Sequence, residues 1–361
     1  MKKKMIINIF LIALSVFTLF IVQRLLMPKY VSTIQEGSLV EEYYKEKTNH
    51  DVIFIGDCEV FSNVSPITLW ENYGITSYIR GSAQQLIWHS YYLLEDTLRY
   101  EKPKVVIYNV LAMKYDEPQK EAYNRLTLDG MKLSNTKIKA IKNSKMEDES
   151  TLSYLFPILR YHSRWSEITA DDFKYIFNKS KISHNGYLMR SDIKPVGYLP
   201  RDKKLADYTL GENSYMYLEK ITQLCKDNDI ELILIKSPSV YPYWHEEWDE
   251  QIVDYAEAND LEYINFLEYN DEIGIDYQTD TYDGGLHLNF AGAEKFSLYL
   301  GNILKEKYKL NDYRNDLIIK GNWDKKIEFY YNMKEQQEFE ISEYGYLISV
   351  GEAVQSINET D

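Results

Sequence analysis

Short apolar runs recur along the body of the chain, and each is followed by a polar turn. The first run, Val52 to Ile55, closes at Gly56-Asp57 and has the continuous apolar character of a strand buried on both faces. The other runs lie at 75–79, 105–108, 232–235 and 263–266. Helical patterns accompany them at about 65–73, 84–100, 212–227, 245–259 and 291–308. This alternation predicts an α/β fold in which helices cover both faces of a parallel sheet.

The alternation breaks between Asn109 and Glu231, where helical patterns and polar turns continue without a clear strand. We expect a helical insertion there, at about 115–210, beside the carboxyl edge of the sheet. Ligands of such sheets bind at that edge, so the insertion could serve as a lid or as a wall that binds a polymer.

The sequence outside the insertion predicts one α/β domain over residues 51–310, followed by C-terminal residues 311–361. An amphipathic helix is expected at about 325–333. The acidic segment from Glu335 onward is expected to be loosely ordered.

The N-terminal residues 1–30 combine basic and apolar character. Lys2, Lys3 and Lys4 precede an apolar run from Met5 to Val22, which is long enough to cross a bilayer and has no small-x-small cleavage pattern after it. This predicts an uncleaved, single-pass signal anchor in the cell membrane. The lysines would lie in the cytoplasm and the main domain would be extracellular. A buried core helix is the alternative, disfavoured by the lack of an amphipathic pattern. The polar residues 31–50 would form a spacer.

Charge and composition limit the classes of molecule that the chain is expected to bind. The 361 residues carry 41 Lys and Arg against 56 Asp and Glu, a net charge of −15 that repels nucleic acid. The 33 tyrosines suit a sugar-binding surface, but abundant Ile, Lys and Asn favour a compositional origin.

The two cysteines differ in their surroundings. Cys58 follows the turn after the first strand, at the edge where sites form, and can be a nucleophile or simply a packed side chain. Cys225 lies on the apolar face of a predicted helix and is expected in the core. No Cys-x-x-Cys or His-x-x-x-His spacing indicates a metal site.

His287 is the best candidate base among the six histidines. It lies in a glycine-rich loop, 280–289, between the last strand and the last core helix. Two nearby carboxylates could orient its ring, with Asp283 the nearer candidate and Asp280 the second. The alternative is a loop histidine without chemistry.

The block Ile55-Gly56-Asp57-Cys58 resembles the Gly-Asp-Ser block of the SGNH (GDSL-like) hydrolases, and 283–287 resembles their Asp-x-x-His block. The resemblance implies a three-layer, flavodoxin-like sheet and an acylated nucleophile. It also implies that His287 is the base and that an aspartate orients it. By position, Gly81, Asn109 and the backbone amide of Cys58 would form the oxyanion hole.

The chain departs from the family pattern in two places. Cysteine replaces serine, which keeps acyl transfer feasible because a thiolate paired with histidine is a strong nucleophile. The carboxylate of Asp283 stands four residues before His287, where the family has three, with Gly284 in the usual slot. This second departure leaves the identity of the acid open.

The resemblance implies an esterase or O-acyltransferase acting on an extracellular polysaccharide or teichoic-acid-like polymer. Membrane-anchored relatives typically work beside a membrane-bound O-acyltransferase, which would be the partner, and no cofactor is implied. The rival expectation is a catalytically silent member that binds polymer or supports such a partner.

Four further side chains are candidates for binding the substrate. Tyr241 and Trp244 could line a sugar groove or form a satellite core, and Arg160 and Arg164 could bind an anionic polymer or make surface salt bridges.

Overall fold

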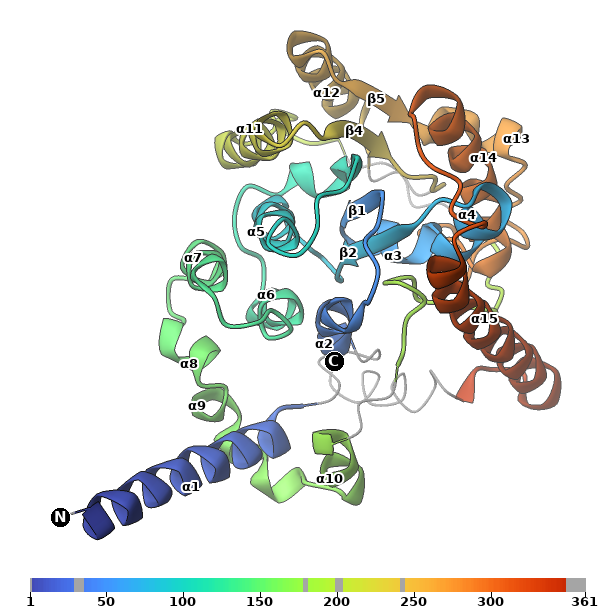
Figure 1. The fold of residues 1–361 in the computed structure, drawn as a ribbon. Helices are drawn as coiled ribbons and strands as arrows, with labels where there is room; N and C mark the ends of the chain where they lie inside the picture. Colours follow the sequence, from blue (N-terminus) through green and yellow to red (C-terminus); the bar gives the residue numbers. More distant parts are fainter. Residues whose placement is uncertain (1, 29–35, 178–180, 199–203, 241–243, 349–361) are drawn as a thin grey trace.

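A five-stranded parallel sheet lies at the centre of the domain in the order β2-β1-β3-β4-β5 (Figure 1). The computed structural model describes residues 2–28, 36–177, 181–198, 204–240 and 244–348. The strands are β1 (Val52–Gly56), β2 (Ser77–Gly81), β3 (Val105–Asn109), β4 (Glu231–Lys236) and β5 (Glu262–Asn265). This is the flavodoxin-like order, in which β2 lies on one side of β1 and the later strands are added on the other side. The predicted fold class is confirmed.

Alternate residues of the strands point into two separate hydrophobic cores. Ile53 and Ile55 face a core covered by α5 (Ile87–Thr97), α11 (Glu212–Asp227) and α12 (Glu246–Asn259). Val52 and Phe54 face the opposite core, covered by α3 (Cys58–Asn63), α4 (Pro66–Tyr73) and α14 (Phe290–Lys307). Burial on both faces explains why the strands are continuous apolar runs in the sequence.

The insertion contains helices, as predicted, but most of it packs away from the sheet. After η2 (Val110–Lys114) come α6 (Glu121–Leu128), α7 (Asn135–Ser144), α8 (Thr151–Leu155), α9 (Ile158–Tyr161), η3 (His162–Glu167) and α10 (Ala170–Phe177). Helix α7 packs on α5, whereas α9, η3 and α10 contact the N-terminal helix.

The non-helical end of the insertion returns to the sheet. The backbone N–H of Ile79 in β2 donates to Asn185 O at 2.9 Å, and Tyr187 is fully buried. Further on, the Lys194 N–H donates to Thr281 O at 2.9 Å. This end of the insertion, and not its helices, therefore lies against the loop that carries His287.

The C-terminal helix α15 (Leu317–Tyr344) is much longer than the predicted 325–333. It corrects the expectation of a loosely ordered segment from Glu335, because Glu335–Tyr344 is helical. The Gln337 side chain explains this order: its Oε1 accepts from the Ser191 N–H at 2.9 Å and its Nε2 donates to Met189 O at 3.2 Å. Residues 349–361 lie outside the described residues.

The second half of the predicted spacer belongs to the domain. It forms α2 (Glu36–Glu42) and η1 (Tyr43–Lys45), and Leu39, Val40 and Tyr43 are buried in the two cores. Buried His50 lies against Glu101, with Nδ1 3.1 Å from the carboxylate. The polar appearance of this segment reflects paired charges on a packed surface.

Helix α1 (Lys2–Leu26) projects from the domain, and α9 and α10 flank its inner end (Figure 1). Its side chains are exposed from Lys2 to Phe20. Its length and apolar composition are sufficient to cross a membrane.

The remaining short elements follow β5. They are η4 (Phe266–Tyr269) and α13 (Asn270–Ile273). Together they lead the chain into the loop that carries His287.

Candidate active site

Cys58 is placed by a tight turn at the carboxyl end of β1. Gly56 has a φ of +151°, and a Cβ there would lie 2.5 Å from Val60 Cγ2, so the turn requires glycine. Asp57 then caps α3, because its Oδ1 accepts the Glu59 N–H at 3.2 Å. Cys58 is consequently the first residue of α3, and its side chain is only partly covered.

The His287 loop holds its ring against Asp283. Asp283 Oδ2 lies 2.6 Å from His287 Nδ1, and Oδ1 accepts the backbone N–H of His287 at 2.9 Å. Gly284 and Gly285 both have positive φ, at +85° and +101°. Two consecutive left-handed glycines coil the loop tightly enough for a carboxylate four residues before the histidine to reach its ring.

Cys58 and His287 lie close enough for each group to shift the pKa of the other. Because Asp283 occupies Nδ1, the remaining ring nitrogen, Nε2, is the one available to the thiol. Tyr282 stacks over the ring, with centroids 5.8 Å apart, and completes the enclosure. The Cys58 thiol, the His287 ring and the Asp283 carboxylate are therefore neighbours in this order, and the ring and the carboxylate are hydrogen-bonded.

Burial and neighbouring groups shift the pKa values of these three side chains in opposite directions. Burial raises the pKa of the Cys58 thiol, although the neighbouring His287 works against that shift. Burial alone would lower the pKa of His287, but Tyr282, Cys58 and Asp283 together hold it well above its ordinary value. Burial favours a higher pKa for Asp283, but its bonds to His287 lower that pKa.

The Asp280 carboxylate bonds to groups other than the His287 ring. It is buried, and its Oδ2 accepts from Lys295 Nζ at 2.6 Å and from the Asp276 N–H at 2.8 Å. These contacts fix the start of the loop to α14. Of the two candidate carboxylates, Asp283 is the one that contacts the His287 ring.

Asn109, expected in the oxyanion hole, is turned toward two buried carboxylates. Its Nδ2 donates to Asp57 Oδ1 at 3.2 Å and to Glu59 Oε2 at 3.0 Å, and its Oδ1 accepts the Ser237 N–H at 2.9 Å. Both amide hydrogens therefore have acceptors inside the protein. In this arrangement the side chain does not point a free donor at a substrate.

A buried ion pair lies next to Asn109, and no motif or spacing in the sequence indicates it. Lys236 Nζ, at the end of β4, donates to Glu59 Oε1 at 2.8 Å and to Ser237 O at 2.7 Å. Burial, reinforced by Glu59, raises the pKa of Asp57 to about 6. Burial lowers the pKa of the nearby Lys114, which interacts with Asp57 and Glu59. Charges of both signs thus converge under the turn that carries Cys58.

The end of α3 is attached to the His287 loop. Asn63 Oδ1 accepts the Leu288 N–H at 2.9 Å, and its Nδ2 donates to Pro238 O at 3.0 Å. One residue earlier, the Ser62 hydroxyl lies 3.2 Å from the Tyr282 hydroxyl. The helix that begins with the thiol therefore fixes the position of the histidine loop.

Gly81, the other expected hole residue, ends β2 opposite Gly56 in the parallel register. A Cβ at Gly81 would lie 3.1 Å from Gly56 O. The small residue lets the two strand ends approach closely beside Cys58.

Three of the four predicted substrate-binding side chains have their contacts elsewhere in the structure. Trp244 Nε1 donates to Asp249 Oδ1 at 2.8 Å and its ring packs on the core. Arg160 pairs with Glu121, and Arg164 donates to Leu26 O and Asp172. Tyr241 lies outside the described residues.

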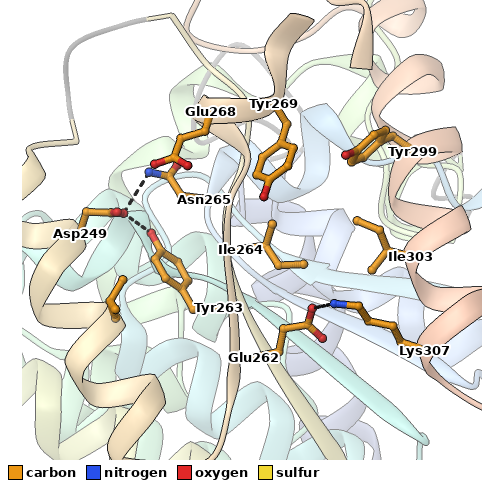
Figure 2. A pocket seen from close by; sticks show the side chains of 11 residues that line it. Asp249, Glu262, Tyr263, Ile264, Asn265, Glu268, Tyr269, Tyr299, Ile303 and Lys307 are labelled. Carbon is orange, nitrogen blue, oxygen red and sulfur yellow. Dashed lines mark hydrogen bonds and ion pairs between the residues drawn. The ribbon is translucent and has the colours of Figure 1, made fainter. Parts of the chain in front are cut away.

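A separate hollow of about 400 Å³ runs along the edge strand β5 (Figure 2). Its polar side chains bond to one another: Asp249 Oδ1 accepts from the Tyr263 hydroxyl at 2.5 Å and from Asn265 Nδ2 at 3.1 Å, and Glu262 pairs with Lys307. Neither Cys58 nor His287 lines it.

Within the described ranges, no group of three or more His, Cys, Asp or Glu side chains is arranged to hold a metal ion. The chemistry that this arrangement can perform is nucleophilic attack by the thiol, with the imidazole carrying the proton.

No protein-family model matches the sequence, and no curated protein matches it. Among solved structures, the chain is similar to an acylhydrolase candidate from Bacteroides fragilis, at 11% identity over 74% of this chain and 94% of that one, with a TM-score of 0.35. A GDSL-like lipase from Bacteroides thetaiotaomicron is similar at 11% identity over 75% and 97% of the two chains, with a TM-score of 0.35. A carbohydrate esterase shares 12% identity over 73% of this chain and 67% of its own, with a TM-score of 0.33. These remote similarities concern the fold, and no residue's role in this chain rests on them.

Proposed function

We propose that the chain is an acyl-ester hydrolase or O-acyltransferase in which Cys58 is the nucleophile, His287 the base and Asp283 the group that orients the base. The observation that carries the proposal is the 2.6 Å contact between His287 Nδ1 and Asp283 Oδ2, next to a Cys58 thiol close enough to His287 for each of the two groups to shift the pKa of the other. A nucleophile, a base and an orienting group in this order are the parts that acyl transfer requires.

In the proposed reaction, the Cys58 sulfur attacks the ester carbonyl while His287 takes the thiol proton. The tetrahedral intermediate collapses, the bond to the alcohol breaks, and His287 returns the proton to the departing alkoxide. A thioester on Cys58 remains. Water or an acceptor hydroxyl then attacks it, losing its proton to His287, and the thiol is restored as the acyl group leaves.

The oxyanion of the intermediate needs donors other than Asn109, whose amide hydrogens bond to Asp57 and Glu59. We assign this role to the backbone amides of Cys58 and Gly81, at adjoining ends of α3 and β2. Charge that develops next to such amides is stabilised most where water is excluded.

We further propose that the enzyme is anchored in the cell membrane by α1, with the domain outside the cell. Lys2, Lys3 and Lys4 at the start of α1 support this orientation. The substrate would be a surface polysaccharide or a teichoic-acid-like polymer. Because one helix offers no path for an activated acyl donor, a membrane-bound O-acyltransferase would deliver the acyl group. Protease added to cells stripped of wall should digest the domain; a fully protected domain would contradict this orientation.

Ester turnover by the purified full-length chain tests the catalytic proposal. Cys58→Ala and His287→Ala should each abolish turnover of an activated acyl ester, whereas Cys58→Ser should retain some. Cys225→Ala is the matched control, because Cys225 is buried in the core on the other face of the sheet. Full activity in Cys58→Ala would remove the proposed mechanism.

A catalytically silent polymer-binding or partner-supporting role is the second candidate. It is favoured by the engaged Asn109 amide and by the burial that raises the pKa of the Cys58 thiol. In that case the unmodified chain would bind polymer without turning over any ester, and Cys58→Ala would bind it equally well.

A further inference from the structure

The free length of α1 matches the thickness of a bilayer. Every side chain from Lys2 to Phe20 is exposed, and contact with the body begins at Ile21. These 19 residues, counted as 20 − 2 + 1, rise about 28 Å at ~1.5 Å per residue. The hydrocarbon core of a bilayer is about 30 Å thick. If α1 spans the membrane, one surface of the bilayer therefore falls where the insertion meets the helix.

The insertion is fixed to α1 at that level. Arg164 Nη1 donates to Leu26 O at 3.0 Å and so bonds a carbonyl that the helix end leaves without an intrahelical partner, while Arg164 Nη2 donates to Asp172 Oδ1 at 3.1 Å. Helices α9 and α10 and the turn η3 contact α1 (Figure 1). A hollow of about 490 Å³ beside Phe20 and Met27 separates the helix from other parts of the insertion. The insertion thus touches α1 without enclosing it.

Five large apolar side chains between residues 156 and 177 are exposed, and we name them the apolar collar. They are Phe156, Leu159, Trp165, Phe173 and Phe177. Trp165 is 73% exposed and Phe177 is 82% exposed, although water-facing surfaces seldom gather such residues. Phe173 and Phe177 are four residues apart on α10 and share one face of it.

We propose that the apolar collar is a second membrane attachment that lies in the headgroup region of the lipid bilayer beside α1. Its position one bilayer thickness from the start of α1 favours lipid over a protein partner. Tryptophan and phenylalanine are residues that favour this region, where an apolar ring meets a polar boundary. The inference rests on the proposed membrane anchorage. It adds that the domain is held at a fixed height and orientation, instead of swinging on one helix.

Site-specific fluorescence in the full-length chain tests this attachment. In a Cys58→Ser background, single cysteines are introduced as Trp165→Cys and Phe177→Cys and labelled with an NBD probe. Cys225 is 1% exposed and stays unlabelled in the folded chain. Leu317→Cys, at an 84% exposed position on α15, is the aqueous control, and Ile12→Cys reports on the anchor. Each protein is reconstituted into phosphatidylcholine vesicles.

We expect lipids with a doxyl group near the headgroup to quench probes 165 and 177 several-fold more than probe 317, and aqueous iodide to show the reverse order. Iodide quenching of 165 and 177 equal to that of 317, with probe 12 in lipid, would overturn the apolar collar and leave the anchor intact. The same result is expected if the collar binds a protein partner instead of lipid, because the vesicles contain no such partner. Quenching of probe 12 by aqueous iodide, without quenching by doxyl lipids, would overturn the membrane anchorage and the apolar collar together.

Discussion

Asn63 Oδ1 accepts the Leu288 N–H at 2.9 Å. The last residue of the helix that starts at Cys58 therefore bonds to the residue that follows His287. The two proposed catalytic groups are 229 residues apart in the sequence, counted as 287 − 58. Their relative position depends on this contact and on the Asn63 bond to Pro238 O. Asn63 is accordingly a positioning residue.

Asn63→Ala should lower kcat by about one to two orders of magnitude with little change in KM, because misplacement by about 1 Å costs that much. Leaving the buried Leu288 N–H without an acceptor should also reduce the free energy of unfolding by about 1–3 kcal/mol. Ester kinetics and urea unfolding measure the two effects. Asn72→Ala is the control, since the Asn72 side chain donates to Thr68 O in its own helix, far from the proposed catalytic groups in the chain. Equal effects of both variants on kcat would contradict the positioning role.

Asp283→Asn should reduce turnover by about 10²–10⁴-fold, the range expected when the group that orients a catalytic histidine is lost. Asp280→Asn should leave turnover of the folded protein near that of the unmodified chain and lower its melting temperature, because Asp280 bonds to Lys295 and to the Asp276 N–H. Steady-state kinetics and thermal unfolding separate the two. A larger catalytic loss from Asp280→Asn would assign the orienting role to Asp280.

The value of kcat/KM should increase with pH through the loss of a single proton, and the midpoint of this limb should lie above pH 6.5. His287 accepts a proton only when neutral, and its pKa is held well above the ordinary histidine value, so activity is low where the ring is protonated and increases as pH rises. In Asp283→Asn the bond that raises this pKa is weakened, and the limb should move to lower pH. A limb at or below pH 6.5 in the unmodified chain would contradict this account of the site.

Lys236→Met should destabilise the fold by about 3–5 kcal/mol, because it removes the cation that is hydrogen-bonded to the buried Glu59 carboxylate. The double variant Lys236→Met, Glu59→Gln should recover part of the loss. Urea unfolding of the four proteins in the cycle provides the coupling energy. Additive losses would show that the two groups do not depend on each other.

Much of the fold could be predicted because its determinants are local. The apolar runs that became β1 to β5 are continuous since both strand faces are buried, and Gly56 marks the turn before Cys58. The errors arose where distant residues decide local structure. The helix continues past Glu335 because Gln337 bonds to Ser191 and Met189, more than a hundred residues earlier in the chain.

In the candidate site, too, local features could be predicted from the sequence and long-range contacts could not. Cys58 and His287 could be singled out from their places after strands, but Asp283 and Asp280 could not be ranked, because the conformations of Gly284 and Gly285 decide which carboxylate reaches the ring. The bond of Asn109 to Glu59 depends on Lys236, at the end of another strand. No sequence spacing indicates such a contact.

Intact-protein mass spectrometry after incubation with an activated acyl ester tests the central claim most directly. The account predicts one acyl adduct on the unmodified chain, mapped by peptide analysis to Cys58. The adduct should be absent in Cys58→Ala and formed much more slowly in His287→Ala. Failure of Cys58 to acquire an acyl group while Cys58→Ala still turns over the ester would contradict it.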